Sequence, residues 1–275
     1  MRLTLSQNIL TPEVKRVQGM LASTGRLEEE LPFLHDLGYT GLEFITTSPK
    51  DVDVASIEKL MEKNDFIPVG VNTGRMTGEL GLTLTSLDEE VRKACEMKMM
   101  DAIDFASIWG IPVNVGIIRG KSVDGGGKER TKECLIQSLT RLSHYAERKG
   151  ASIVIETVAP PLMDNLNTLS EANEIIQEVG SSSLALMYDF YQMDLLEEDF
   201  FGAMEKYFPL CRHLHFADSE RKVPGKGKID FEKVIEKLSV LGYAGPASIE
   251  IAPLPSEREA AREAAEYLLP LIEKY

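Results

Sequence analysis

Cysteine is scarce in this chain, and its few thiols are far apart. Cys95, Cys134 and Cys211 are odd in number, and none belongs to a CxxC pair. The pattern therefore indicates neither a disulfide framework nor a zinc site built on thiolates. We expect these side chains to be reduced residues of the core.

Positive charge and long apolar runs are also in short supply. The chain has 30 lysines and arginines against 44 aspartates and glutamates, a formal net charge of −14. A field of this sign repels the backbone of nucleic acids, so we expect a small-molecule partner and no nucleic acid. No stretch approaches the roughly 20 apolar residues needed to cross a bilayer, and MRLTLSQNIL lacks the features of a signal peptide. We expect a cytoplasmic protein with no membrane partner.

A phosphate-binding fingerprint is missing as well. The glycine run at 125–127 precedes a segment of helical period, but it has neither the GxGxxG nor the GxxxxGK[ST] order. We interpret it as a mobile loop and predict no nucleotide cofactor.

Short β-rich runs alternate with longer segments of helical period throughout the chain. Eight such pairs predict an α/β protein, a (β/α)₈ TIM barrel in one domain spanning residues 1–275. Parallel strands also permit an open doubly wound sheet, but eight units without a phosphate fingerprint favour closure. The predicted strands are Leu3–Ser6, Leu42–Ile45, Ile67–Val71, Val113–Ile117, Ser152–Glu156, Ala185–Asp189, His213–Phe216 and Ala247–Ile251.

Several helix boundaries carry local signals. Leucines recur at helical spacing from Leu27 to Leu37, and Gly38 follows where a C-terminal cap belongs. A hydroxyl followed three residues later by a glutamate predicts a capping box at three later helix starts. These pairs are Ser86 with Glu89, Thr168 with Glu171 and Ser256 with Glu259.

Four successive predicted strands end in side chains that can bind a metal. These side chains are Glu156, Asp189, His215 and Glu250. A barrel carries its chemistry at the C-terminal ends of its strands, where three carboxylates together would need a cation. Three oxygen ligands and one imidazole suit one divalent ion, Mn²⁺ best and then Mg²⁺ or Co²⁺. Taken singly, each carboxylate could instead cap a helix, and His213 shares the strand face of His215, so spacing does not choose between the two rings.

Three segments carry a resemblance to a known family. They read HLHFADSERKVPGKGKIDFEKVIEKLSVLGYAGPASIEI, NTGRMTGELGLTLTS and VGIIRGK. Through them the chain resembles, over nearly its whole length, the xylose isomerase-like barrels, and among these the ketose 3-epimerases typified by D-tagatose 3-epimerase. The resemblance implies that Glu156, Asp189, His215 and Glu250 hold the metal. It places His213 beneath the metal ligand His215.

The resemblance also concerns the substrate and the assembly. It implies that Arg221, Gln192 and His213 belong to the substrate-binding residues, and dimers or tetramers among relatives leave a homo-oligomer open. Two departures leave the identity of the sugar open. Gln192 stands where relatives place the histidine of a DxxH motif, and Glu156 is followed by TVAPPLMD in place of an asparagine–arginine stretch with a second glutamate.

The expected chemistry is proton transfer at the carbon beside a carbonyl, through an enediolate. Glu156 and Glu250 on opposite faces of that carbon would make the protein a 3-epimerase of a ketose or ketose phosphate. Proton return to the neighbouring carbon would instead give aldose–ketose isomerisation. The alternatives are a lyase acting on a keto-inositol or a dehydroshikimate-like acid, and a non-catalytic sugar-binding barrel. A DNA-repair endonuclease of this barrel type is disfavoured by only four histidines and the net charge.

Basic residues cluster in one predicted loop, and two interpretations of this loop remain open. Arg221, Lys222, Lys226 and Lys228 fall in one predicted loop, which is either solvated or an anion pocket for a phosphate or carboxylate of the substrate. Arg119 and Lys121, after the fourth strand, are further candidates for such a pocket.

Overall fold

The strands close into a barrel in the order in which they occur in the sequence. The computed structural model of the protein describes residues 2–275. Each strand pairs in parallel with the next, and β1 pairs with β8, so the predicted single-domain (β/α)₈ barrel is confirmed. The strands are β1 (Thr4–Leu10), β2 (Gly41–Ile45), β3 (Ile67–Asn72), β4 (Pro112–Val115), β5 (Ser152–Glu156), β6 (Leu184–Asp189), β7 (Cys211–Phe216) and β8 (Pro246–Ile249).

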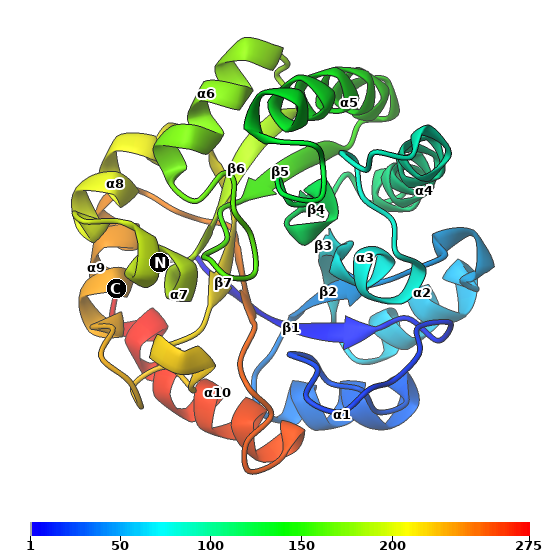
Figure 1. The fold of residues 1–275 in the computed structure, drawn as a ribbon. Coiled ribbons are helices and arrows are strands. Elements are labelled where there is room, and N and C mark those ends of the chain that lie inside the picture. The colour runs from blue at the N-terminus through cyan, green and yellow to red at the C-terminus, as the bar shows by residue number, and fades with distance from the viewer. Residues whose placement is uncertain (1) are drawn as a thin grey trace.

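Helices surround the barrel in a ring, and two short helices, α3 and α7, lie inside that ring in the view of Figure 1. Within residues 2–275, no helix combines the length and apolar character that crossing a membrane requires. The helices are α1 (Leu27–Asp36), α2 (Val54–Lys63), α3 (Gly74–Leu80), α4 (Glu89–Ser107), α5 (Lys128–Lys149), α6 (Leu169–Val179), α7 (Phe190–Leu196), α8 (Phe200–Tyr207), α9 (Phe231–Val240) and α10 (Glu257–Lys274).

Several boundary predictions are wrong, among them the ends of β4 and β8, which stop at Val115 and Ile249. Strand β1 continues to Leu10, because its last residues pair with the whole of β2. Helix α4 is capped by Asp88, whose carboxylate accepts from the N–H of Glu90, so Ser86 does not cap it. The capping box of Thr168 is confirmed.

Side chains along the strands alternate between the helix layer and the barrel interior. In β5, Ile153 and Ile155 join the main core between strands and helices, whereas Val154 belongs to a separate small cluster with Ala185 and Met187 of β6. Residues two apart share a face, so Glu156 continues the inward row of Val154. The alternation therefore places outward apolar side chains in the core and delivers inward polar ones to the C-terminal rim.

Candidate active site

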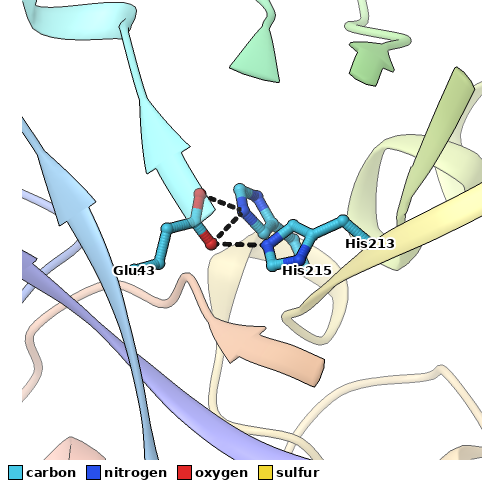
Figure 2. Close-up of side chains that lie close together, drawn as sticks. All are labelled: Glu43, His213 and His215. Carbon is cyan, nitrogen blue, oxygen red and sulfur yellow. Dashed lines mark hydrogen bonds and ion pairs between the residues drawn. The ribbon is translucent and has the colours of Figure 1, made fainter. Parts of the chain in front are cut away.

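Strand β7 directs two imidazoles into the barrel interior. His213 and His215 lie on one face of the strand, and both are buried. Glu43 of β2 contacts both rings: its Oε2 lies 2.6 Å from Nε2 of His213 and 3.0 Å from Nε2 of His215 (Figure 2). The second ring nitrogen of His215, Nδ1, is then the one that faces the neighbouring carboxylates.

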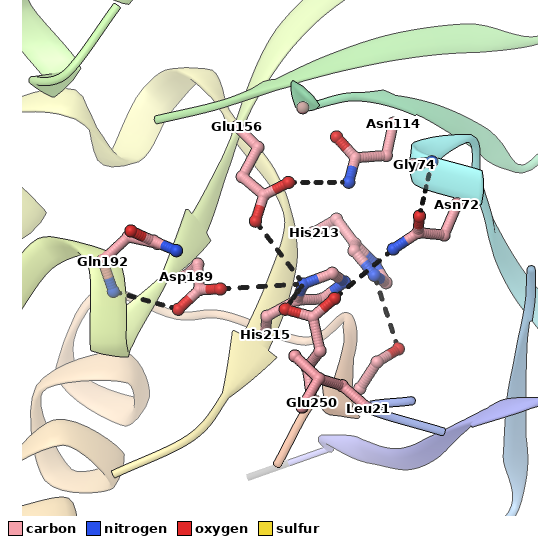
Figure 3. Close-up of polar contacts among 12 residues, drawn as sticks. Leu21, Asn72, Gly74, Asn114, Glu156, Asp189, Gln192, His213, His215 and Glu250 are labelled. Atoms are coloured by element: carbon pink, nitrogen blue, oxygen red, sulfur yellow. Dashed lines mark hydrogen bonds and ion pairs between the residues drawn. The ribbon is translucent and has the colours of Figure 1, made fainter. Parts of the chain in front are cut away.

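Three carboxylates gather at that nitrogen (Figure 3). Glu156 ends β5, Asp189 ends β6, and Glu250 directly follows β8. Oxygens of Glu250, Glu156 and Asp189 lie 3.4, 4.0 and 4.0 Å from Nδ1 of His215. Ligand-type atoms of the four side chains all lie within 4.8 Å of one another. The structure thus brings together the four residues predicted to hold a metal, which we call the rim cluster.

The rim cluster fits a divalent cation. Within residues 2–275, the buried Nδ1 of His215 makes no hydrogen bond, and buried polar atoms normally have a partner. Nη1 of Arg221 lies 2.7 Å from Oδ2 of Asp189 and 2.9 Å from Oε2 of Glu250. Arg221 therefore offsets one of the three carboxylate charges. The remaining two equal the charge of a divalent ion, and oxygen with imidazole ligands suits Mn²⁺ or Mg²⁺ better than a thiolate-seeking metal.

The surroundings shift the pKa values of the two glutamates in opposite directions. Burial, the charge of Glu250 and that of Asp189 raise the pKa of Glu156 to about 7. Burial acts on Glu250 in the same direction, but the charges of His215 and Arg221 outweigh it and lower the pKa of Glu250 to about 2. The pKa values of the two glutamates therefore lie on opposite sides of the ordinary carboxyl value, and the raised one belongs to Glu156, which Arg221 does not contact.

Two asparagines support the two glutamates, and sequence reasoning missed both. Asn114 donates from Nδ2 to Oε2 of Glu156 at 3.0 Å, and Asn72 donates from Nδ2 to Oε1 of Glu250 at 3.4 Å. Each comes from the C-terminal half of a strand, β4 or β3. Their positions late in two strands could have indicated that they lie near the site. A neutral amide, however, does not indicate catalysis by itself.

The loop after β7 holds Arg221 in place. Glu220 and Arg221 have φ values of 61° and 56°, in the left-handed region that side chains usually avoid. The carboxylate of Asp218 anchors the loop by accepting from four backbone N–H groups, those of Ser219, Gly225, Gly227 and Ile229. The ring of Tyr191 lies 4.7 Å from the guanidinium carbon of Arg221. These contacts aim the guanidinium at the rim cluster.

A cavity of about 320 Å³ opens onto the rim cluster. Glu156, Glu250, Arg221 and Gln192 line it, together with Arg75 of α3. Nη2 of Arg75 lies 3.2 Å from Oε2 of Glu79. Apolar side chains form much of the remaining wall: Val17, Met20, Leu21, Ile45, Ile117, Val158 and Leu162. Sequence reasoning did not single out Arg75.

The two remaining predicted substrate contacts occupy different positions. Gln192 lines the cavity, and its Oε1 accepts from the N–H of Ala159 at 2.8 Å. His213 lies deeper, beneath His215, with its ring on Glu43, and it is not among the residues that line the cavity.

The prediction that Arg119 could belong to an anion pocket is wrong. Its side chain is fully buried, and the backbone carbonyls of four residues together with one amide oxygen accept all five of its N–H groups. The acceptors are Gly116, Glu156, Asn165 and Leu166, with Oδ1 of Asn165. Arg119 therefore ties the loop after β5 to the loop after β4.

The lysines after β7 favour the interpretation as a solvated loop. Each has an acidic partner outside the cavity, and its side chain is about half exposed or more. The pairs are Lys222 with Glu220, Lys226 with Glu263 and Lys228 with Asp194. Lys121 donates to the carbonyl of Pro161.

Comparison with known proteins identifies the family. The model of the xylose isomerase-like TIM barrel family matches residues 31–271. The chain belongs to this family. The solved structure of an L-ribulose 3-epimerase shares this barrel fold with a TM-score of 0.81 and 20% sequence identity, over 98% of this chain and 94% of that one.

Curated relatives of this xylose isomerase-like barrel include sugar epimerases and an isomerase. The chain is 27% identical to a D-psicose 3-epimerase of Agrobacterium fabrum, over 42% of this chain and 40% of that protein. It is 25% identical to the hydroxypyruvate isomerase of Escherichia coli, over 76% of this chain and 82% of that protein. The matches to the first four curated relatives span 40% to 58% of those proteins' own length, about half.

Proposed function

We propose that the protein is a metal-dependent epimerase that inverts C3 of a ketose or ketose phosphate. The observation that carries this proposal is the position of Glu156 and Glu250. Both line the cavity, stand at the ends of strands β5 and β8, and have a carboxylate oxygen 4.0 and 3.4 Å from Nδ1 of His215. The epimerase names of several relatives support the same reaction class.

The rim cluster residues Glu156, Asp189, His215 and Glu250 would hold one divalent ion, for which Mn²⁺ suits the ligands best. When bound, the ion supplies Lewis acidity that stabilises negative charge on the substrate's carbonyl and hydroxyl oxygens. Arg221 and Gln192, which line the cavity beside the rim cluster, would orient the sugar by hydrogen bonds.

The two glutamates would divide the proton transfers. One carboxylate removes the proton from C3, and the electrons of the broken C–H bond move into the C2–C3 bond and onto the carbonyl oxygen. The other glutamate, as an acid, adds a proton to the opposite face, which inverts the centre. A raised pKa suits Glu156 to this role, because a group that titrates near neutrality can both accept and release a proton.

Aldose–ketose isomerisation is the second candidate. The match with hydroxypyruvate isomerase over 76% of this chain supports it, whereas the matches with a ketose 3-epimerase and an L-ribulose 3-epimerase each cover 78%. Hydroxypyruvate carries a carboxylate, and Arg75 would place a cation near such a group or near a phosphate. The keto-inositol or dehydroshikimate-like lyase and the non-catalytic sugar-binding barrel are the remaining alternatives.

Deuterium incorporation from heavy water tests the proposal. The Mn²⁺-loaded protein is incubated with ketoses, ketose phosphates, keto-inositols and hydroxypyruvate, and the products are examined by NMR. We expect deuterium at C3 of a ketose and accumulation of its C3 epimer. Exchange at C1 with formation of an aldose would instead show aldose–ketose isomerisation. Loss of water from the substrate would show a lyase. Binding of a ketose without any exchange would identify a sugar-binding barrel.

A further inference from the structure

Below the rim cluster lies a second acidic site that the proposed reaction does not use. Glu43 is 1% exposed, and its carboxylate faces the rings of both His213 and His215 (Figure 2). Besides the two contacts of Oε2, Oε1 of Glu43 lies 3.1 Å from Nε2 of His215. Both carboxylate oxygens thus contact His215, on the side of the ring opposite the rim cluster.

We infer that Glu43 is a positioning residue that fixes the ring of His215 with its proton on Nε2, so that Nδ1 is presented to the metal. The inference rests on the proposed metal site. An ionised carboxylate only accepts hydrogen bonds, so each Nε2 that contacts Glu43 must be the donor. A neutral imidazole with hydrogen on Nε2 has its lone pair on Nδ1, the atom that faces the three carboxylates of the rim cluster.

The surroundings of Glu43 preserve this arrangement. His213 supplies a second donor, which holds the carboxylate where it reaches His215, and Oγ of Ser248 lies 3.4 Å from Nε2 of His213. Gly70 of β3 makes room: a Cβ there would lie 3.3 Å from Cγ of Glu43 and 3.5 Å from Cε1 of His213. His213 thus acts through Glu43, and Glu43 acts through His215.

A metal ion is the rival occupant of this second site. Ligand-type atoms of Glu43, His213 and His215 also lie within 4.8 Å of one another. However, the nitrogen–oxygen distances of 2.6 and 3.0 Å are hydrogen-bond lengths. One carboxylate facing two rings also lacks the excess of negative charge that marks the rim cluster.

The test is a titration of metal-free protein with Mn²⁺, with the free ion measured by electron paramagnetic resonance. Glu43→Gln keeps the shape but leaves one imidazole N–H facing an amide N–H. We expect the affinity for Mn²⁺ to fall about 10- to 100-fold, the usual effect of removing a partner behind a metal ligand. Glu30→Gln is the matched control, since Glu30 is equally a buried glutamate, paired with Arg258 far from the cavity. It should leave the affinity unchanged.

A second measurement separates positioning from a structural role. The chain has four histidines, so ¹⁵N NMR of the Mg²⁺-loaded protein can follow each ring. We expect His215 to carry its proton on Nε2 in the wild type and to lose this fixed state in Glu43→Gln. Should Glu43→Gln not fold, Glu43→Asp keeps the charge but retracts the carboxylate, and the same loss of affinity is expected.

The outcomes distinguish the inference from the proposed function. A wild-type protein that binds no Mn²⁺ would contradict the metal site itself. If the wild type binds one ion and folded Glu43→Gln or Glu43→Asp binds it equally well, the inference alone is overturned. Two ions per chain in the wild type would likewise overturn it, because the second site would then be a metal site.

Discussion

The barrel interior contains two acidic sites, one above the other, that share His215 and differ in charge. In the lower site a single carboxylate, Glu43, meets two imidazole donors, and both of its oxygens are hydrogen-bonded. In the rim cluster three carboxylates face one imidazole nitrogen and the single guanidinium of Arg221. In the lower site the carboxylate has a donor for each oxygen, whereas the rim cluster lacks positive charge and opens onto the cavity. This difference supports the proposal that the rim cluster holds a metal and carries the chemistry.

The largest effect should come from removing a proton carrier while keeping the ligand shape. Glu156→Gln and Glu250→Gln can still offer an oxygen to the metal, but the amide takes up no proton. At saturating Mn²⁺ we expect kcat to fall on the order of 10²-fold or more in each. The two variants should differ in solvent exchange, since each retains the base for one face. Near-normal turnover in both would show that the carboxylates only hold the ion.

Lowering the pH should affect the two sites differently. Metal ligands must be deprotonated, and the raised pKa of Glu156, about 7, means that protons compete with the metal below neutrality. The affinity for Mn²⁺ should therefore fall roughly tenfold for each pH unit below 7. Despite burial, the charges of His215 and His213 hold the pKa of Glu43 well below its usual value, so the lower site stays ionised. Isothermal titrations between pH 5 and 8 measure the slope, and a pH-independent affinity would contradict this account of Glu156.

A smaller effect should follow at the wall of the cavity, outside both acidic sites. Gln192 is neutral, whereas the histidine expected there in relatives can carry charge. Gln192→His should change the ratio of kcat/KM between two ketoses by about 2- to 10-fold, the worth of one hydrogen bond. Metal affinity should not change. If all such ratios stayed fixed, Gln192 would not contact the substrate.

The sequence predicted the rim cluster better than the site beneath it, for a physical reason. Barrel closure brings the ends of successive strands to one rim, so a charged residue that closes an apolar strand can be placed from the chain alone. Glu43 lies within β2, and its partner His213 is 170 residues away. That contact depends on which inward side chains meet across the closed barrel, which periodicity does not reveal.

Arg119 shows the same limit for long polar side chains. Its position after β4 was compatible with an anion site at the rim. Its guanidinium instead meets carbonyls of the loop after β5, whose path no sequence pattern indicated. Strand positions follow from period and composition, whereas the partners of a flexible side chain depend on loop geometry.

The most direct test of the charge difference between the two sites is the Mn²⁺ content of purified, metal-reconstituted protein and of Asp189→Asn. This substitution keeps the shape of a ligand but removes one of the three rim carboxylates. Asp164→Asn, in a loop outside the cavity where the carboxylate accepts from backbone N–H groups, is the control. We expect one ion per chain in the wild type and the control, and a severe loss in Asp189→Asn by elemental analysis. Equal metal content in all three proteins would contradict the rim cluster as the metal site.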